Sequence, residues 1–310
     1  MYRQFYGLTA EPFSLNPELG PIYPGSRYVT ASTILDYAVL RGEGIVAVTG
    51  EVGCGKTTLI RHFLNTSVAN HCVGVISNPS MLKETLIAGI LLAFHQQVTA
   101  NQVGLLYAGF HAFLGAQLAT GRSPLLIVDE AQNLSVEVLE ELRLLTNPEI
   151  DGGAVLQLVL VGQPGLQQML YRPDLSQLLQ RVVAHCHLES LSEDETSDYV
   201  AHRLAWAGCR RALFTPSAVT NIHRGANGIP RLINMICDRA LLYGYSEELQ
   251  QIDSEVIAQV IADRGLGGFA PTSNMTDTPA QSTTTMAATA TPIAIDNEAP
   301  RQSFSVGKQR

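Results

Sequence analysis

One ten-residue stretch, GEVGCGKTTL at residues 50–59, restricts the fold of this 310-residue chain more than any other feature. It follows the apolar run IVAVT at 45–49 and precedes a segment with a helical pattern. Its spacing is G-x-x-x-x-G-K-[ST], in which glycines let backbone N–H groups curl around phosphate oxygens. A helix that starts near Lys56 points the positive end of its dipole at the same phosphates. The stretch therefore predicts a phosphate-binding loop between a buried strand and a helix.

The loop supplies nine expected nucleotide-binding residues: Gly50, Glu51, Val52, Gly53, Cys54, Gly55, Lys56, Thr57 and Thr58. Lys56 is expected to reach the β and γ phosphates, and the Thr57 hydroxyl is expected to bind Mg²⁺. Cys54 is expected to be a small filler, although a thiol near phosphates can be oxidisable.

Short apolar runs alternate with amphipathic segments along the middle of the chain. Buried parallel strands have this appearance, because helices cover both faces of their sheet. The runs are IVAVT (45–49), CVGVI (72–76), LLIV (125–128), VLQLVLV (155–161) and VVAHCHL (182–188), with helical candidates near 57–66, 81–97, 103–119 and 135–146. We therefore expect an α/β fold with a parallel five-stranded sheet.

The pattern divides the chain into four parts. An N-terminal segment over 1–43 precedes the α/β domain over 44–190, and 191–263 look all-helical because the strand signal disappears. Residues 264–310 are rich in Gly, Pro, Ser, Thr and Ala, so they cannot bury enough apolar surface to offset the entropy of ordering. We predict a disordered tail there, which is either inert or a docking peptide.

Helix-start signals support an all-helical segment after residue 190. Ser192 and Glu195 have the spacing of a capping box, and Thr215 followed by Pro216 marks a second start. The sequences GIPRLINMICDRALLYGY and DSEVIAQVIADR indicate two more helices.

Two acids follow the apolar run LLIV. Asp129 at the strand end can hold Mg²⁺ through water, and Glu130 can orient and deprotonate an attacking water. A pair of acids at a strand end can also be a solvated cap. The phosphate-binding loop elsewhere in the chain favours the catalytic interpretation.

Three further polar residues are candidates for contacts with phosphate. Gln163 directly follows an apolar run, where strand ends in a parallel sheet collect ligand groups, but it can also be a turn residue ahead of Pro164. Arg181 precedes the last run and Arg231 begins a helix. A guanidinium suits phosphate and can act as an arginine finger, whereas either arginine can equally form a surface salt bridge.

Composition limits the class of protein. The net charge of −8 argues against a chain that wraps nucleic acid, although a local basic patch can exist. The five cysteines form no CxxC pair, which favours neither a zinc site nor a disulfide framework and fits a reducing cytoplasm. The N-terminus lacks the pattern of a secretory signal, and no stretch reaches the roughly 18 apolar residues of a membrane helix. We expect a cytoplasmic protein, and any association with the inner membrane would come through partners or a surface contact.

These motifs together resemble the AAA+ ATPases of the ExeA/GspA-like secretion type, and more narrowly those encoded with exosortase and exopolysaccharide loci. The resemblance covers about residues 1–263. It rests on FYGL-x-x-x-PF at 5–13, GEGIVAVTGEVGCGKTTL, LLIVDEAQNL, LEELRLLTN, LVGQP, LLQRV and GIPRLINMICDRALLYGY.

The resemblance implies a P-loop NTPase of three layers, followed by a small helical lid, with ATP and Mg²⁺ as cofactors. Gln163 matches sensor 1, Arg231 matches sensor 2, and Arg181 matches an arginine finger that acts on a neighbouring subunit. A homo-oligomer is therefore implied. The N-terminal segment, with Tyr23 and Arg27, falls where such ATPases cover the adenine, although packing alone also explains Tyr23.

Three functions remain open at this stage. The resemblance implies an ATPase motor or switch that serves secretion or exopolysaccharide export. Longer members continue into a peptidoglycan-binding domain, and the low-complexity tail puts direct peptidoglycan binding by this chain in doubt. Related proteins with the same DEAQ element assemble on DNA and recruit a transposase, which the acidic net charge disfavours. The third function is an ATP-dependent scaffold, which the complete set of catalytic candidates disfavours.

Overall fold

A computed structural model describes residues 1–16, 20–42, 44–82, 85–98, 102–147 and 156–264. All of these residues belong to one compact unit, Met1–Phe269. The tail predicted over 264–310 lies outside the described residues, apart from Arg264.

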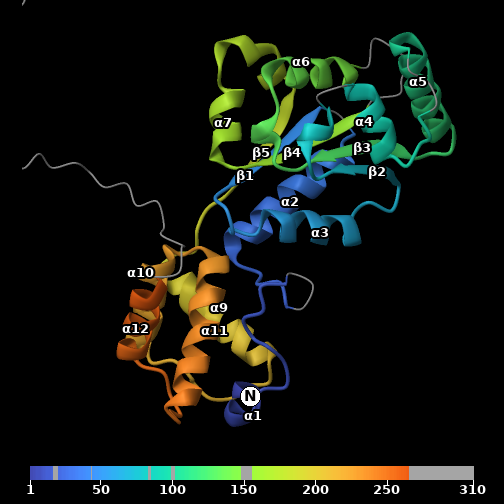
Figure 1. The fold of residues 1–310 in the computed structure, drawn as a ribbon. Coiled ribbons are helices and arrows are strands. Elements are labelled where there is room, and N and C mark those ends of the chain that lie inside the picture. The colour runs from blue at the N-terminus through green and yellow to red at the C-terminus, as the bar shows by residue number, and fades with distance from the viewer. Residues whose placement is uncertain (17–19, 43, 83–84, 99–101, 148–155, 265–310) are drawn as a thin grey trace, which may run out of the picture. The chain divides into compact units, whose positions relative to one another are not determined.

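Five parallel strands form a single sheet in the order β2-β3-β4-β1-β5 (Figure 1). The strands are β1 (Ile45–Gly50), β2 (His71–Ile76), β3 (Ser123–Val128), β4 (Gln157–Gly162) and β5 (Val182–Leu188). Each of the five apolar runs in the sequence forms one of these strands. Strand β1 lies between β4 and β5, with Thr49 opposite Gly162 on one side and His187 on the other.

Helices cover both faces of the sheet, which explains why the strands are continuously apolar. Along β1, Ile45 and Ala47 belong to one hydrophobic cluster, whereas Val46 and Val48 belong to a second cluster on the opposite face. Helices α2 (Ser26–Leu40) and α3 (Lys56–Thr66) cover the second face. The first face is covered by α4 (Leu86–Ala93), α5 (Val103–Ala119), α6 (Val136–Leu145), α7 (Pro164–Leu170) and α8 (Ser176–Leu179) (Figure 1). The chain therefore has the predicted three-layer α/β fold.

The helix predicted over 81–97 is much shorter in the structure. A 3₁₀ turn, η1 (Pro79–Leu82), precedes α4, which ends at Ala93. Two residues later His95 has a left-handed backbone with φ of 57°, a conformation that ends helices. Phe94 meanwhile packs on Phe113, with ring centroids 5.0 Å apart. The apolar residues that suggested one long helix therefore pack in the core from a shorter helix and the residues that follow it.

The C-terminal described residues form four helices around a third hydrophobic cluster. These are α9 (Glu193–Trp206), α10 (Pro216–Ala226), α11 (Pro230–Ser246) and α12 (Ser254–Arg264). Both predicted start signals are confirmed. Ser192 and Glu195 form a reciprocal capping box at α9, and the Thr215 hydroxyl accepts a hydrogen bond from Ala218 N at the start of α10.

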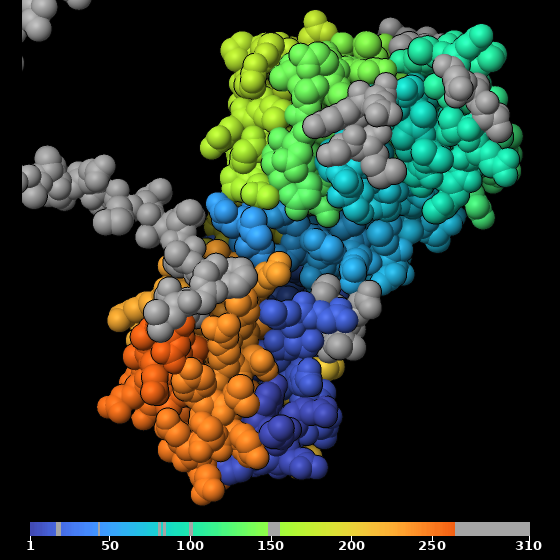
Figure 2. Space-filling model, in the orientation of Figure 1, coloured from blue at the N-terminus to red at the C-terminus, as the bar shows by residue number. Residues whose placement is uncertain are grey.

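The N-terminal segment packs on these C-terminal helices, and Figure 2 shows its blue residues lying against the orange ones. Tyr6, Leu8 and Phe13 are buried in the third cluster, next to the short helix α1 (Tyr2–Tyr6). The Tyr2 hydroxyl donates to Asp238 Oδ1 at 2.6 Å. The motif at residues 5–13 therefore holds the first part of the chain to the helical part.

No helix among the described residues is both long enough and apolar enough to cross a membrane.

Candidate nucleotide-binding site

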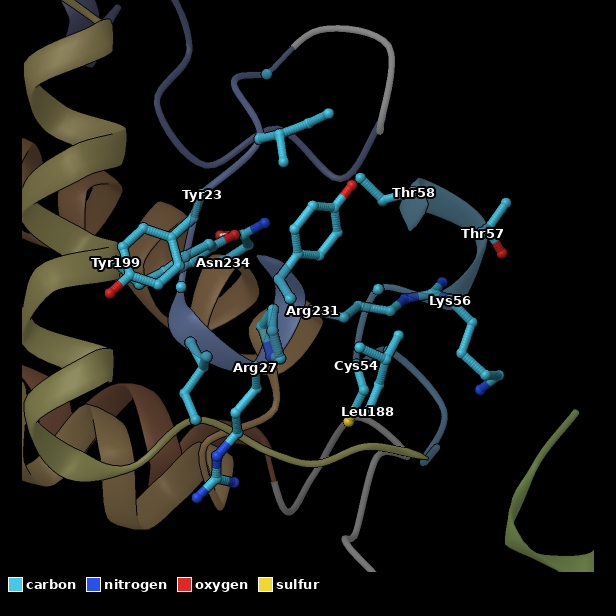
Figure 3. A pocket seen from close by; sticks show the side chains of 18 of the residues that line it. Tyr23, Arg27, Cys54, Lys56, Thr57, Thr58, Leu188, Tyr199, Arg231 and Asn234 are labelled. Atoms are coloured by element: carbon cyan, nitrogen blue, oxygen red, sulfur yellow. Dashed lines mark hydrogen bonds between the residues drawn. The ribbon is translucent and has the colours of Figure 1, made fainter. Parts of the chain in front are cut away.

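A cavity of about 400 Å³ opens beside the phosphate-binding loop (Figure 3). Loop residues from Val52 to Thr58 line it together with Asp129, Glu130 and Arg231. The N-terminal segment, helices α9 and α11, and the end of β5 with the residues that follow it supply the remaining walls. Its volume is in the range of pockets that enclose small ligands, roughly 300–1,000 Å³.

The side chain of Lys56 folds back onto the phosphate-binding loop. Strand β1 ends at Gly50 and α3 begins at Lys56, so the helix N-terminus faces the cavity. The ammonium donates to Gly50 O at 2.7 Å and to Glu51 O at 3.0 Å. Burial lowers the pKa of Lys56, because the charged form loses hydration. A buried cation here suits a polyanion such as a triphosphate.

Gly53 fits against the start of α11. Its φ is +90°, and a side chain at this position would place Cβ 2.7 Å from Arg231 Cβ. Arg231 N also donates to Gly53 O at 3.3 Å. The exposed side chain of Arg231 lines the cavity, and its contact with phosphate stays a prediction.

Cys54 is buried in the cluster that contains α3 and β1. Burial raises the pKa of the Cys54 thiol, so the reactive thiolate is disfavoured. The structure therefore favours the filler interpretation.

The two acids lie at the end of β3. Asp129 N donates to Ile76 O at 2.8 Å, and Glu130 N donates to Asp129 Oδ1 at 2.9 Å. Burial raises the pKa of the Asp129 carboxyl. Both residues line the cavity, which places their carboxylates opposite the loop that would hold phosphates.

Gln163 lies beside Glu130 but is not among the residues that line the cavity. Its Nε2 donates to Glu130 Oε2 at 3.2 Å. Gln132, in the turn η2 (Ala131–Asn133), completes this group: its Nε2 donates to Glu130 Oε2 at 2.5 Å, and its Oε1 accepts from Gln163 N at 3.0 Å. Gln132 was not predicted from the sequence, although it stands in the DEAQ element itself.

Arg181 does not reach this cavity. It directly precedes β5, and Arg181 O accepts a hydrogen bond from Ile45 N at the start of β1. Its Nη2 donates to Asn147 Oδ1 at 3.2 Å. Arg181 therefore lies at the amino-terminal edge of the parallel sheet, whereas the loop and the acids lie at the carboxyl edge.

The far end of the cavity is aromatic. The Tyr23 ring packs edge-on against Tyr199, with centroids 5.6 Å apart, and both residues line the cavity (Figure 3). Tyr23 thus packs on α9 and also lines the cavity, while the predicted adenine contact stays a prediction. Arg27 forms an ion pair with Glu189 and donates to Ser190 O at 3.0 Å.

Two further lining residues were not found from the sequence. Asn234 on α11 is buried, and its Oδ1 accepts from the Tyr199 hydroxyl at 2.9 Å. Arg203 is 6% exposed and donates through Nε to Pro12 O at 2.5 Å. Neither belongs to a motif with a recognised phosphate-binding role, so only the assembled cavity identifies them.

The donor set fits a nucleotide with Mg²⁺. Thr57 and Asp129 offer hydroxyl and carboxylate oxygens at one cavity. Among the described residues no group of three or more His, Cys, Asp and Glu could hold a metal. This is expected for Mg²⁺, which proteins bind through one or two carboxylates plus substrate phosphates.

Residues 39–170 match the family model of the AAA domain. The chain is 44% identical over 253 residues to general secretion pathway protein A of Aeromonas hydrophila, which covers 81% of this chain and 46% of that protein. The chain therefore spans about half the length of this relative. By these two matches the chain contains a region similar to the AAA domain and is similar to general secretion pathway protein A.

Solved structures share the fold at low sequence identity. Cdc6p from Pyrobaculum aerophilum has a TM-score of 0.61 at 15% identity, covering 84% of this chain and 74% of that one. The ORC2 protein of Aeropyrum pernix has a TM-score of 0.58 at 16% identity, with the same coverage of 84% and 74%. Both likenesses confirm the P-loop AAA fold.

Proposed function

We propose that this chain is an oligomeric ATPase that works as a motor or switch in secretion or exopolysaccharide export. The observation that carries the ATPase part is one cavity lined by a buried lysine, a threonine hydroxyl and two carboxylates. The 44% identity to a general secretion pathway protein supports the secretion part. The narrower placement with exosortase- and exopolysaccharide-associated ATPases rests on the sequence motifs.

The residues divide the chemistry between them. Loop N–H groups and Lys56 would hold the β and γ phosphates, while Thr57 and Asp129 would hold Mg²⁺, which would neutralise charge on the phosphates. Glu130 accepts the proton of the attacking water, and Gln163 orients that water or the γ phosphate. Arg231 contacts the phosphates from α11.

Arg181 completes a neighbouring site rather than its own. Its position at the opposite edge of the sheet leaves it too far from its own loop. An arginine finger supplied in trans stabilises charge in the transition state. On this proposal hydrolysis requires a homo-oligomer.

The test is hydrolysis by purified protein with Mg²⁺ across an ATP concentration series. Lys56→Ala is expected to weaken nucleotide binding, whereas Glu130→Gln keeps binding and blocks hydrolysis. The proposal fails if wild-type hydrolysis is absent or equals that of Lys56→Ala. It also fails in its assignment of roles if both variants lose nucleotide binding equally.

Partners are tested in cells that express the Glu130→Gln variant, which would trap the ATP-bound oligomer. A crosslinked pull-down followed by mass spectrometry is expected to recover envelope-export or secretion components. These would place a cytoplasmic protein at the inner membrane through its partners.

A DNA-dependent regulator is the second candidate, because Drosophila ORC bound to DNA shares the fold with a TM-score of 0.55 at 18% identity. ATP-dependent retention of duplex DNA on a filter at low salt, together with capture of a transposase, would favour it.

A further inference from the structure

Gln132 makes two hydrogen bonds that connect Glu130 with Gln163 at the carboxyl edge of the sheet. Its Nε2 donates to Glu130 Oε2 at 2.5 Å, on the same chain turn. Its Oε1 accepts from the backbone of Gln163 at 3.0 Å, where β4 leads into α7. One side chain thus connects the end of β3 to the end of β4.

The space around Gln132 is closely fitted. A Cβ added to Gly162 would lie 2.7 Å from Gln132 Oε1, and one added to Gly165 would lie 3.9 Å from Gln132 Cβ. A side chain at 162 would therefore displace the Gln132 amide. The GQP and DEAQ elements are complementary in shape, which gives Gly162 a role that phosphate binding does not explain.

An amide is required here, since it donates to a carboxylate at one end and accepts from a backbone N–H at the other. Methionine has similar length and offers neither, whereas glutamate accepts but cannot donate when ionised. The hydrogen bond to a charged acceptor is also the stronger kind.

We propose that Gln132 is a positioning residue, which holds the Glu130 carboxylate through its Nε2 and the Gln163 backbone through its Oε1, so that both residues face the attacking water as one unit. The proposal rests on the ATPase function proposed above. Glu130 needs such support, because its backbone is left-handed with φ of 52° and its side chain extends from a turn. Catalytic side chains act well only when neighbours fix their orientation.

The geometry separates this role from nucleotide binding. Gln132 is not among the residues that line the cavity, whereas Glu130 is. Loss of Gln132 is therefore expected to lower kcat and to leave the affinity for nucleotide nearly unchanged, because the groups that hold phosphates are not touched.

The first experiment compares Gln132→Met with the wild-type protein. We expect kcat to fall roughly 10- to 100-fold, as for lost partners of catalytic ligands, with KM and the Kd for nucleotide within about 2-fold. Gln168→Met is the matched control, since Gln168 is exposed on α7. A kcat within about 2-fold of wild type, or an equal loss in Kd, would overturn the proposal.

The second experiment tests the contact without turnover. Gln132→Glu places two carboxylates together, and we expect Tm to fall by roughly 3 °C or more. Adding Glu130→Gln to Gln132→Glu reverses donor and acceptor, so Tm should recover although hydrolysis stays absent. A double variant no more stable than the sum of the two single changes would refute the contact.

The two proposals fail in different ways. Absence of Lys56-dependent hydrolysis in wild-type protein removes the ATPase function, while the Tm cycle still decides whether Gln132 holds Glu130. Wild-type hydrolysis with an unaffected Gln132→Met variant removes only the positioning role.

Discussion

At the scale of single residues, Gly53 and Gly55 meet different requirements of the phosphate-binding loop. Both have positive φ, at +90° and +103°, so alanine is strained at either position by about 1–2 kcal/mol. Only Gly53 also meets Arg231 and Ile229, whereas nothing lies within 4 Å of a Cβ added to Gly55. The loop thus needs one glycine for backbone shape alone and one for shape and close packing.

We predict that Gly53→Ala is more destabilising than Gly55→Ala. The overpacked contact with α11 adds about 1–3 kcal/mol to the backbone strain. Denaturant unfolding of the nucleotide-free protein measures both variants, with Gly55→Ala as the control for strain. Equal losses of unfolding free energy would mean that α11 does not rest on the loop.

The titration of His185 is expected to make the stability of the protein depend on pH. Its Nε2 lies 2.8 Å from the Thr49 hydroxyl, and burial, with His187 nearby, lowers the pKa of His185 below 6.5. The unfolded chain therefore binds this proton at a higher pH than the folded one. The contribution to stability is present above pH 6.5 and is lost as pH falls through the folded pKa.

The expected result is a smaller free energy of unfolding at pH 5 than at pH 7, with a weaker decline in His185→Gln. Glutamine can keep a hydrogen bond to Thr49 and does not titrate. His95→Gln changes an exposed histidine and is the control for the slope of unfolding free energy against pH. A decline in His185→Gln that matches the wild-type decline would contradict this prediction.

Side-chain hydrogen bonds from Ser192 and Glu195 cap the start of helix α9. The Ser192 hydroxyl accepts from Glu195 N at 3.2 Å, and Glu195 Oε2 accepts from Ser192 N at 3.0 Å. We predict that Ser192→Ala lowers the free energy of unfolding by about 1 kcal/mol, and Ser192→Gly by only a few tenths. Thermal or denaturant unfolding measures both variants, and a Ser192→Ala protein as stable as the wild type would contradict the prediction.

Elements with a strong local signal could be predicted from the sequence. All five strands follow continuous apolar runs, because helices cover both faces of a parallel sheet. The starts of α9 and α10 follow side-chain caps, which act within a few residues. Asp129, Glu130 and Lys56 were likewise found from motifs, because strand ends and loop glycines place them at one edge of the sheet.

Features that depend on distant packing could not be predicted. The short helices α7 and α8 have 7 and 4 residues, too few for a clear helical period. Asn234 and Arg203 reach the cavity from helices α11 and α9, far from the phosphate-binding loop in the sequence. The role of Gln132 could not be predicted because it depends on a contact with Gln163, 31 positions away.

At the scale of the whole molecule, a single chain does not bring all predicted catalytic residues together. Arg181 precedes β5, and the loop follows β1, which runs parallel to β5. The seven residues of β5 separate the two edges by about 20 Å. If Arg181 is an arginine finger, as we propose, it would therefore act only between subunits of an assembly.

Mixing two inactive variants tests this arrangement. Lys56→Ala cannot hold the nucleotide but keeps Arg181, whereas Arg181→Ala keeps the nucleotide site but lacks the finger. We predict that each variant alone is inactive and that an equal mixture, after subunit exchange, hydrolyses ATP at about a quarter of the wild-type rate. The fraction follows because half of the sites are intact and half of those meet an intact arginine. An active Arg181→Ala protein, or a mixture without activity, would place the finger elsewhere.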